Sequence, residues 1–244
     1  MLSGTADLGT LATRAPSMPS FDAEPVHLAS VEVFQAMFEL PYATRQATLP
    51  PGLHPTNPSL LVVVAWRAAD SPWGPFAMAQ ARVQCRSGVR PRGFVAGAII
   101  DNPDAAAALA ASFGLPGLPG TVRLSRRYDS AELVVEREGR RVAHLVGIDP
   151  DPLSAGDVQY SVTTTLASTP RGLRLVQVEP EYSFQRVERL RPRVLAFDGA
   201  AWGEPLLQPR HPVSATVAVG ELTIPGLRYL SRPEVSAFEG TERL

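Results

Sequence analysis

The chain has 244 residues, of which 45% are hydrophobic, and a formal net charge of −1. This length and apolar content suffice to bury the core of one β-rich domain or of two smaller ones. The near-neutral balance excludes both the basic field typical of nucleic-acid-binding proteins and an acidic tail for basic partners.

The sequence contains no lysine, because all 23 of its Lys and Arg residues are arginine. No side-chain amine can therefore form a Schiff base, and Met1 carries the only other amine. We attribute this composition to a GC-rich coding style rather than to function. The single cysteine, Cys85, excludes an intrachain disulfide and is typical of a reducing compartment.

Residues 1–25 lack a basic start and a continuous apolar run, so they do not resemble a signal peptide. We expect them to form a flexible arm before a single domain at 26–244. No stretch reaches the ~18 apolar residues that a membrane-spanning helix needs. The sequence predicts a cytoplasmic protein that binds neither nucleic acid nor membrane.

Short β-branched and apolar runs separated by turn signals predict strands along most of the chain. One helix is expected at 102–113 and a short helical turn at 42–50, while 215–226 fits either a strand or a helix. The expected strands are 31–40, 59–68, 76–86, 92–101, 121–129, 130–138, 140–148, 158–168, 172–190 and 191–199. Many short strands and one central helix predict a mainly β (α+β) domain, either a barrel or a curved-sheet sandwich.

The expected helix has clear boundaries. Asn102 can cap its first turn, Asp104 favours the positive end of the helix dipole, and Gly114 supplies a left-handed stop after Phe113. The next residues, 114–120, read Gly-Leu-Pro-Gly-Leu-Pro-Gly, which forces a tight loop because proline fixes φ and glycine permits positive φ. In isolation this segment would be a helix-to-strand connection and nothing more.

An ordered series of motifs surrounds this loop: Trp-Gly-Pro-Phe at 73–76, Ile-Ile-Asp-Asn at 99–102, the alanine-rich helix and Phe-Gly-Leu-Pro at 113–116. The series resembles the acetoacetate decarboxylase superfamily from about Val31 to Leu145, and more weakly beyond. In that family the helix ends in Gly-Phe-Pro-Lys-Lys. The resemblance implies a curved β-cone or barrel around an apolar pocket, a homo-oligomer, and a lysine that forms a Schiff base with a β-keto acid.

The charged residues of that family are replaced here. Gly117 stands at the position of the nucleophilic lysine and Leu118 at that of its neighbour. The family's acidic residue after the Gly-Pro-Phe element falls on Met78. A second acidic position falls near Val63, and an arginine falls near Val31. Decarboxylation through a Schiff base is therefore excluded by composition, provided that the Met1 amine lies outside the pocket.

The resemblance implies a dry pocket that would suit an apolar, carbonyl-bearing ligand of polyketide type. Alternatively, the same side chains form an ordinary core that closed when the lysine was lost. The expected lining comprises Val63, Trp73, Phe76, Met78, Phe113, Leu115, Gly117 and Leu118.

Few polar residues are candidates for the pocket. Gln80 would share the face of Met78 on a strand and hydrogen-bond a ligand carbonyl, or else satisfy a buried backbone group. His54 and His144 could act as general acid or base, although structural roles are equally open. Arg123 could clamp an anionic group or lie on a solvated face. No spacing indicates a metal site, and we expect no cofactor.

These observations predict a cofactor-independent tailoring enzyme of secondary metabolism. It would cyclise or isomerise an apolar carbonyl compound by holding it in a reactive conformation. Two alternatives stay open: a non-catalytic ligand-binding protein of the same fold, and a lyase or dehydratase that transfers protons through a histidine.

Overall fold

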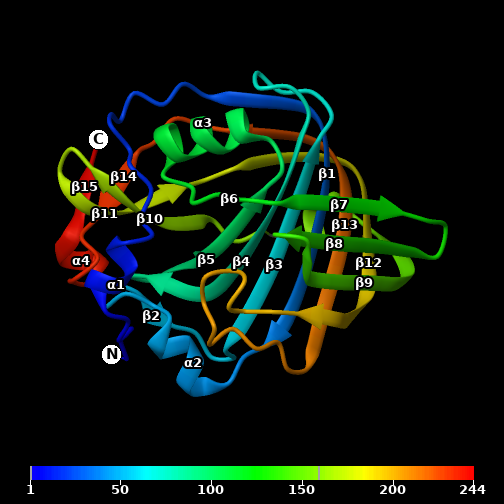
Figure 1. Cartoon of the computed structure of the whole chain (residues 1–244), viewed down its shortest axis with the longest axis horizontal. Helices are drawn as coiled ribbons and strands as arrows, with labels where there is room; N and C mark the ends of the chain where they lie inside the picture. The colour runs from blue at the N-terminus through cyan, green and yellow to red at the C-terminus, as the bar shows by residue number, and fades with distance from the viewer. Residues whose placement is uncertain (1, 159) are drawn as a thin grey trace.

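The computed structural model describes residues 2–158 and 160–244. Met1, whose α-amino group bears on the Schiff-base argument, lies outside the described residues, as does Gln159. Almost all strands belong to one continuous, strongly curved sheet (Figure 1). The strands are β1 (Val26–Glu39), β2 (His54–Pro55), β3 (Leu60–Ala68), β4 (Phe76–Ser87), β5 (Arg90–Ile100), β6 (Leu118–Pro119), β7 (Thr121–Arg126), β8 (Ser130–Arg137), β9 (Arg140–Leu153), β10 (Thr163–Thr169), β11 (Gly172–Val178), β12 (Glu181–Phe197), β13 (Pro212–Ile224), β14 (Tyr229–Ser231) and β15 (Thr241–Arg243).

The sheet is open rather than a closed barrel. Its strand order is β15-β14-β11-β10-β5-β4-β3-β1-β13-β12-β9-β8-β7, with β2 paired to β4 and β6 paired to β5. Register shifts interrupt several pairs, among them β4 with β5, and such irregularities bend a sheet. The mainly β class is thus confirmed, and of the predicted forms, a curved sheet or a barrel, the structure has the curved sheet.

The helices are α1 (Leu8–Ala12), α2 (Tyr42–Ala47), α3 (Pro103–Phe113) and α4 (Ala237–Gly240), with a 3-10 turn η1 (Ala155–Asp157). The predicted boundaries of α3 are confirmed. The Asn102 side chain accepts hydrogen bonds from the backbone N–H groups of Asp104 and Ala105, and Gly114 ends the helix at φ 61°. Among the described residues, no helix has the length and apolar character needed to cross a bilayer.

Two strand predictions need revision. The stretch 172–190 is not one strand, because Glu179 and Pro180 separate β11 from β12, and Pro180 lacks the N–H needed for a strand ladder. Strand β12 instead continues to Phe197. The ambiguous stretch 215–226 is mostly strand β13, which pairs with β1 on one side and β12 on the other.

The N-terminal segment contacts the rest of the domain at several points. Gly4 N–H donates to Leu53 O at 2.9 Å, and Met18 N–H donates to Ser168 O at 2.8 Å. Met18 is completely buried. Backbone hydrogen bonds and an apolar anchor therefore connect the described part of segment 1–25 to the sheet, while its flexibility stays a prediction.

The central strands β1, β3, β4 and β5 bury both of their faces. We call one side the α3 face, because α3 packs there, and the other the β8 face, where β7, β8 and β9 pack. Along β4, even-numbered residues from Phe76 to Gln84 point to the α3 face. Odd-numbered residues from Ala77 to Cys85 point to the β8 face and are all apolar.

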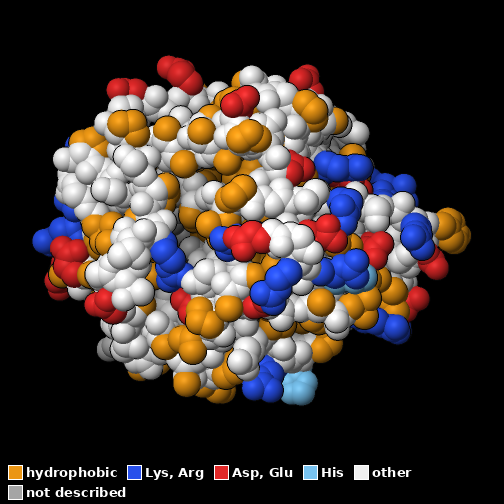
Figure 2. All heavy atoms as spheres, viewed as in Figure 1, with side chains coloured by type: hydrophobic (Ala, Val, Ile, Leu, Met, Phe, Trp, Pro, Cys, Tyr) orange, Lys and Arg blue, Asp and Glu red, His pale blue; other side chains and the backbone are white. Residues whose placement is uncertain are grey.

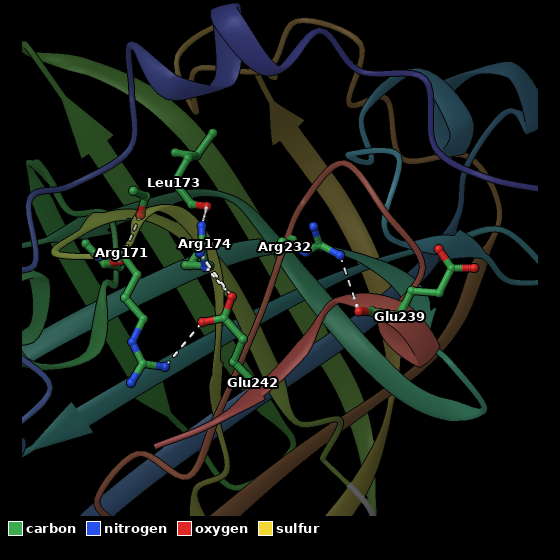
Figure 3. A network of polar contacts seen from close by, with 8 residues as sticks. Arg171, Leu173, Arg174, Arg232, Glu239 and Glu242 are labelled. Atoms are coloured by element: carbon green, nitrogen blue, oxygen red, sulfur yellow. Dashed lines mark hydrogen bonds and ion pairs between the residues drawn. The ribbon is translucent and has the colours of Figure 1, made fainter.

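The C-terminal edge is held by ion pairs (Figure 3). The Glu242 carboxylate lies 3.2 Å from an Arg171 nitrogen and 3.0 Å from an Arg174 nitrogen, and Arg232 donates to the backbone oxygen of Glu239. Figure 2 shows acidic and basic side chains interspersed over β7 and β8, in keeping with surface pairs such as Arg123 with Glu136. These surface charges are of mixed sign and therefore do not form a single-sign binding field on this face.

Candidate functional site

The loop after α3 lies against the end of β5. A Cβ atom at Gly117 would lie 2.8 Å from the Cδ1 methyl of Ile100. Leu118 pairs in parallel with Ile99. Where the family resemblance implies a lysine, an aliphatic side chain of β5 therefore occupies the adjoining space.

Strand β4 leads from this region toward a buried polar pair. Phe76, Met78, Gln80 and Arg82 follow one another on the α3 face and are each 3% exposed or less. Six residues of extended strand span about 20 Å. The α3 face of β4 is therefore apolar at one end and polar at the other.

Gln80 is held in one orientation by Arg82. The Arg82 Nε–H donates to Gln80 Oε1 at 2.7 Å, which directs the amide nitrogen of Gln80 the other way. That nitrogen lies 3.3 Å from the Met78 sulfur, a weak acceptor. The Gln80 amide is thus a buried, oriented donor whose partner within the protein is poor.

Arg82 is buried without an acidic partner among the described residues. Its Nη1 donates to Ser161 O at 3.2 Å, while Nη2 has no hydrogen-bond partner in the part of the chain that the structure describes. Burial lowers the pKa of Arg82 to about 10, and the nearby Tyr182 opposes this effect only in part. Gly93 provides room for the side chain, because a Cβ there would lie 3.1 Å from Arg82 Cδ.

Aromatic side chains form a wall beside this polar pair. Tyr160, Tyr182 and Phe184 have ring centroids 4.9–5.4 Å apart, and Trp66 meets Tyr182 edge-on at 6.4 Å. The Tyr160 hydroxyl lies 3.2 Å from Thr216 Oγ1. Burial raises the pKa of Tyr182 to about 12, so its phenol stays neutral at physiological pH.

Strand β10 adds hydroxyl groups to the same face. Thr163 and Thr165 alternate with Ala167, which belongs to the apolar cluster of the α3 face, and both threonine hydroxyls are buried without a partner. Thr163 is in register with Gly93, which in turn is opposite Gln84 of β4. The α3 face thus carries several buried hydrogen-bonding groups that the described residues leave unsatisfied.

Most of the expected pocket residues form packed core. Phe76, Met78, Phe113 and Leu115 belong to the apolar cluster of the α3 face, and Trp73 packs against it. A groove of about 620 Å³ opens at one end of this cluster, at the ends of the central strands. It is lined by Ser30, Val31, Glu32, Arg67, Ala68, Ala69, Pro75, Phe76, Ala77, Asp101, Val122 and Val219.

Three members of the apolar cluster, Val31, Ala68 and Phe76, line that groove. It also holds an ion pair between Glu32 and Arg67 at 2.6 Å. Burial raises the pKa of Asp101, which accepts a hydrogen bond from Ala77 N–H at 2.7 Å. The groove therefore combines an apolar floor with a charged rim.

Three expected lining residues lie elsewhere. Leu118 pairs with Ile99 and packs against the apolar cluster of the β8 face. Val63 points to the β8 face, opposite to Met78, because it occupies an odd position of β3 in register with Ala81. The ungapped alignment therefore assigned Val63 to the wrong side. The Arg123 side chain is 57% exposed and pairs with Glu136 on the surface at 2.9 Å, so it clamps no interior group.

Neither histidine shares the site of Gln80. His54 is buried on β2, where its Nδ1 lies 3.1 Å from Leu2 O, and its register partner on β4 is Arg86. Arg86 is six residues beyond Gln80, or about 20 Å along the strand. His144 lies on β9 with its Nε2 2.6 Å from Glu132 Oε1.

The buried arginine and the aromatic side chains of this site were not among the residues predicted from sequence. Arg82 could have been found, since it follows Gln80 at the same two-residue spacing that relates Gln80 to Met78. Trp66 could have been found from the β3–β4 hairpin, where it pairs with Met78. Tyr160 and Tyr182 come from distant segments, and no local pattern places them beside β4.

No protein-family model and no curated protein matches the sequence. Solved structures do match. Acetoacetate decarboxylase from Legionella pneumophila is 19% identical, with a TM-score of 0.74 over 84% of this chain and 86% of its own. The enduracididine biosynthesis enzyme MppR, complexed with pyruvate, is 19% identical, with a TM-score of 0.70 over 84% and 90%.

An acetoacetate decarboxylase-like enzyme from Sphingomonas wittichii RW1 is 16% identical, with a TM-score of 0.69 over 84% of this chain and 92% of its own. At these identities the likeness concerns the fold. The chain therefore has the acetoacetate decarboxylase fold.

Proposed function

We propose that the protein is an enzyme that acts on a small, largely apolar carbonyl compound at the α3 face of β4, without a Schiff base or a cofactor. The observation that carries this proposal is the Gln80 amide, which Arg82 orients and only a thioether engages. A buried donor of this kind can polarise a ligand carbonyl, and it needs no reorganisation when the reaction begins.

The chemistry that fits is conformational. The chain has no lysine, and Ile100 fills the space beside Gly117. The proposed reaction therefore involves no covalent intermediate at that position. A wall of Trp66, Tyr182 and Phe184 can instead hold a conjugated ligand in a bent, reactive conformation. Positioning of this kind lowers barriers by several kcal/mol, which suits a cyclisation, cycloaddition or isomerisation.

A place in natural-product biosynthesis is supported by the structural likeness to MppR, an enzyme of enduracididine biosynthesis. We therefore propose a tailoring step of secondary metabolism on a polyketide-like substrate, in a cytoplasmic homo-oligomer. A proton-transferring lyase is less well supported, because His54 and His144 lie on other elements and contact Leu2 and Glu132.

A non-catalytic binding protein is the second candidate, and the packed core around Phe76, Met78 and Phe113 favours it. The two candidates are separated by deleting the gene in the source organism, comparing metabolites, and incubating any accumulating compound with the purified protein. Conversion without added cofactor supports the enzyme. Unchanged products that the protein binds but leaves intact support the binding protein.

The role of Gln80 is tested with a matched pair of variants. Gln80→Leu should bind the accumulating compound normally but convert it about 100-fold more slowly, as expected for a lost carbonyl-polarising donor. Gln177→Leu is the control, because Gln177 is also buried and also accepts from an arginine, Arg92, at 3.0 Å. Equal turnover by the two variants would contradict the role given to Gln80.

A further inference from the structure

We infer that Arg82 and the hydroxyls of β10 form an anion-binding subsite on the α3 face, which takes a single ionised oxygen of an acidic enol or phenol. The inference deepens the proposed function by naming a substrate class for the same site. It also holds if the protein binds that class without transforming it.

The first argument is the unmatched charge. Arg82 is 1% exposed, and its described contacts are the neutral oxygens of Gln80 and Ser161. A buried cation without a counter-ion is unfavourable unless an anion or a hydrogen-bonding network compensates it. By contrast, the buried Arg92 lies 3.2 Å from the carboxylate of Glu179. The fold therefore provides a carboxylate for Arg92 and leaves Arg82 without one.

The second argument is the direction of the free donor. Carboxylates usually take two parallel N–H groups of a guanidinium. Here Nε is engaged by Gln80 and Nη1 by Ser161, so Nη2 is the nitrogen left without a partner. One free nitrogen suits a ligand that presents one anionic oxygen, such as an enolate or a phenolate.

The third argument is the surroundings of that nitrogen. The hydroxyls of Thr163 and Thr165 lie on the same face and have no partner of their own, so they can donate to a second oxygen of the ligand. The Tyr182 side chain lies close enough to Arg82 to influence its pKa, and Trp66 meets the Tyr182 ring edge-on. A planar, conjugated anion gains both stacking and charge-assisted hydrogen bonds there.

The test uses three probes of similar size: 1,3-cyclohexanedione, which is an enolate at neutral pH, its neutral O-methyl ether, and benzoate as a carboxylate. Binding to the full chain is measured by calorimetry and by quenching of tryptophan fluorescence. We expect the enolate to bind roughly 10- to 100-fold more tightly than the ether, as for hydrogen bonds to a charged group. Benzoate should bind more weakly than the enolate.

The variants are Arg82→Met and, as a matched control, Arg92→Met. Arg82→Met should abolish the preference for the enolate over the ether, and Arg92→Met should keep it. In case Arg82→Met does not fold, the arginine Nε–H signals of the wild type are followed by NMR. The Arg82 signal, assigned with Arg82→Lys, should shift saturably with the enolate and not with the ether.

Three results overturn the inference: no saturable enolate binding, equal affinity for enolate and ether, or a preference that survives in Arg82→Met. Tighter binding of benzoate than of the enolate overturns the single-oxygen assignment. The proposed function fails separately. If enolates bind at Arg82 but the accumulating compound is never converted, the subsite stands without the enzyme. If the accumulating compound is converted but the protein shows no preference for enolates, the proposed function stands and the anion-binding subsite is refuted.

Discussion

The two faces of β4 differ in whether they carry buried hydrogen-bonding groups without a partner. On the β8 face, Ala77, Ala79, Ala81 and Val83 pack against an apolar cluster and have no hydrogen-bonding side chains. On the α3 face, Met78 is followed by Gln80 and Arg82, and Arg82 keeps an unpartnered nitrogen. Both faces are buried to a similar degree, so burial alone does not explain why only one of them is polar.

The difference indicates which face serves only the fold. Small aliphatic side chains suffice to pack the β8 face, and a similar face on the other side would have been more stable than a buried arginine. Polar groups that folding does not require are expected at functional sites, where stability is lost in exchange for binding or catalysis. The α3 face is therefore the face on which a ligand is to be sought.

The largest expected effect comes from moving a charge to the other face. In Ala81→Arg a long cation would enter the apolar cluster of the β8 face, where Ala81 is completely buried. We expect a loss of at least about 4 kcal/mol in the free energy of unfolding, or no cooperative folding, measured by urea denaturation. A variant that retains wild-type stability would show that the β8 face also tolerates a buried charge. The proposed difference between the two faces would then be contradicted.

The loop after α3 contains two glycines that we expect to have different roles. Gly114 is required by its backbone conformation, whereas Gly117 stands where the family resemblance implies a lysine. Gly114 has φ 61°, and a Cβ there would lie 2.8 Å from the Cβ of Ala167. Gly114→Ala should lower the free energy of unfolding by about 2 kcal/mol through strain and overpacking. At Gly117, which has no positive φ, the tightest contact of a Cβ would be the terminal methyl of Ile100, and the Cβ of Ala106 is 3.5 Å away. Gly117→Ala should therefore change the free energy of unfolding by less than about 1 kcal/mol.

Thermal or urea unfolding of the two variants side by side gives the comparison. If Gly117→Ala destabilises as much as Gly114→Ala, the glycine at 117 is needed by the backbone. It would then not be explained as the place of a lost nucleophile.

Sequence patterns predicted the parts of the fold that depend on neighbours in the chain. The hairpin of β4 and β5, the cap at Asn102 and the stop at Gly114 all rest on local chemistry. The inward direction of Gln80 followed from alternation. Val63 was placed wrongly because a shift of one residue in an alignment moves a side chain to the other face of a sheet. The packing of the N-terminal segment and the aromatic wall depends on contacts between distant segments, which alternation does not encode.

Removing the polar pair should stabilise the protein. Burial lowers the pKa of Arg82 to about 10, which corresponds to a penalty on the order of 3 kcal/mol at neutral pH. The hydrogen bond from Arg82 to Gln80 offsets part of that penalty. Replacing both partners in Arg82→Met with Gln80→Leu leaves neither of them unsatisfied, so unfolding should require about 1–3 kcal/mol more, measured in urea. A loss of stability would mean that the pair supports the fold, as the β8 face does.

Enolate binding should depend on the charge of Arg82. A base whose pKa is lower in the folded state than in the unfolded state destabilises the folded state below its folded pKa. For Arg82 this penalty is present at neutral pH and is relieved as the pH rises above its folded pKa of about 10. The anion needs the charged form, so its affinity should be constant up to about pH 9 and then fall as the pH rises through 10.

The described titratable groups beside Arg82 are tyrosines, so we attribute the pH dependence of enolate affinity to the loss of the Arg82 charge alone. Burial raises the pKa of Tyr182 to about 12 and raises that of Tyr160 as well, so both phenols stay neutral across this range. Affinity for 1,3-cyclohexanedione should thus fall about tenfold between about pH 9 and pH 11 in the wild type, measured by calorimetry. Arg82→Met should bind weakly at every pH. If the affinity of the wild type already falls near pH 7, another group controls the pH dependence. That result would contradict enolate binding by Arg82 on the α3 face.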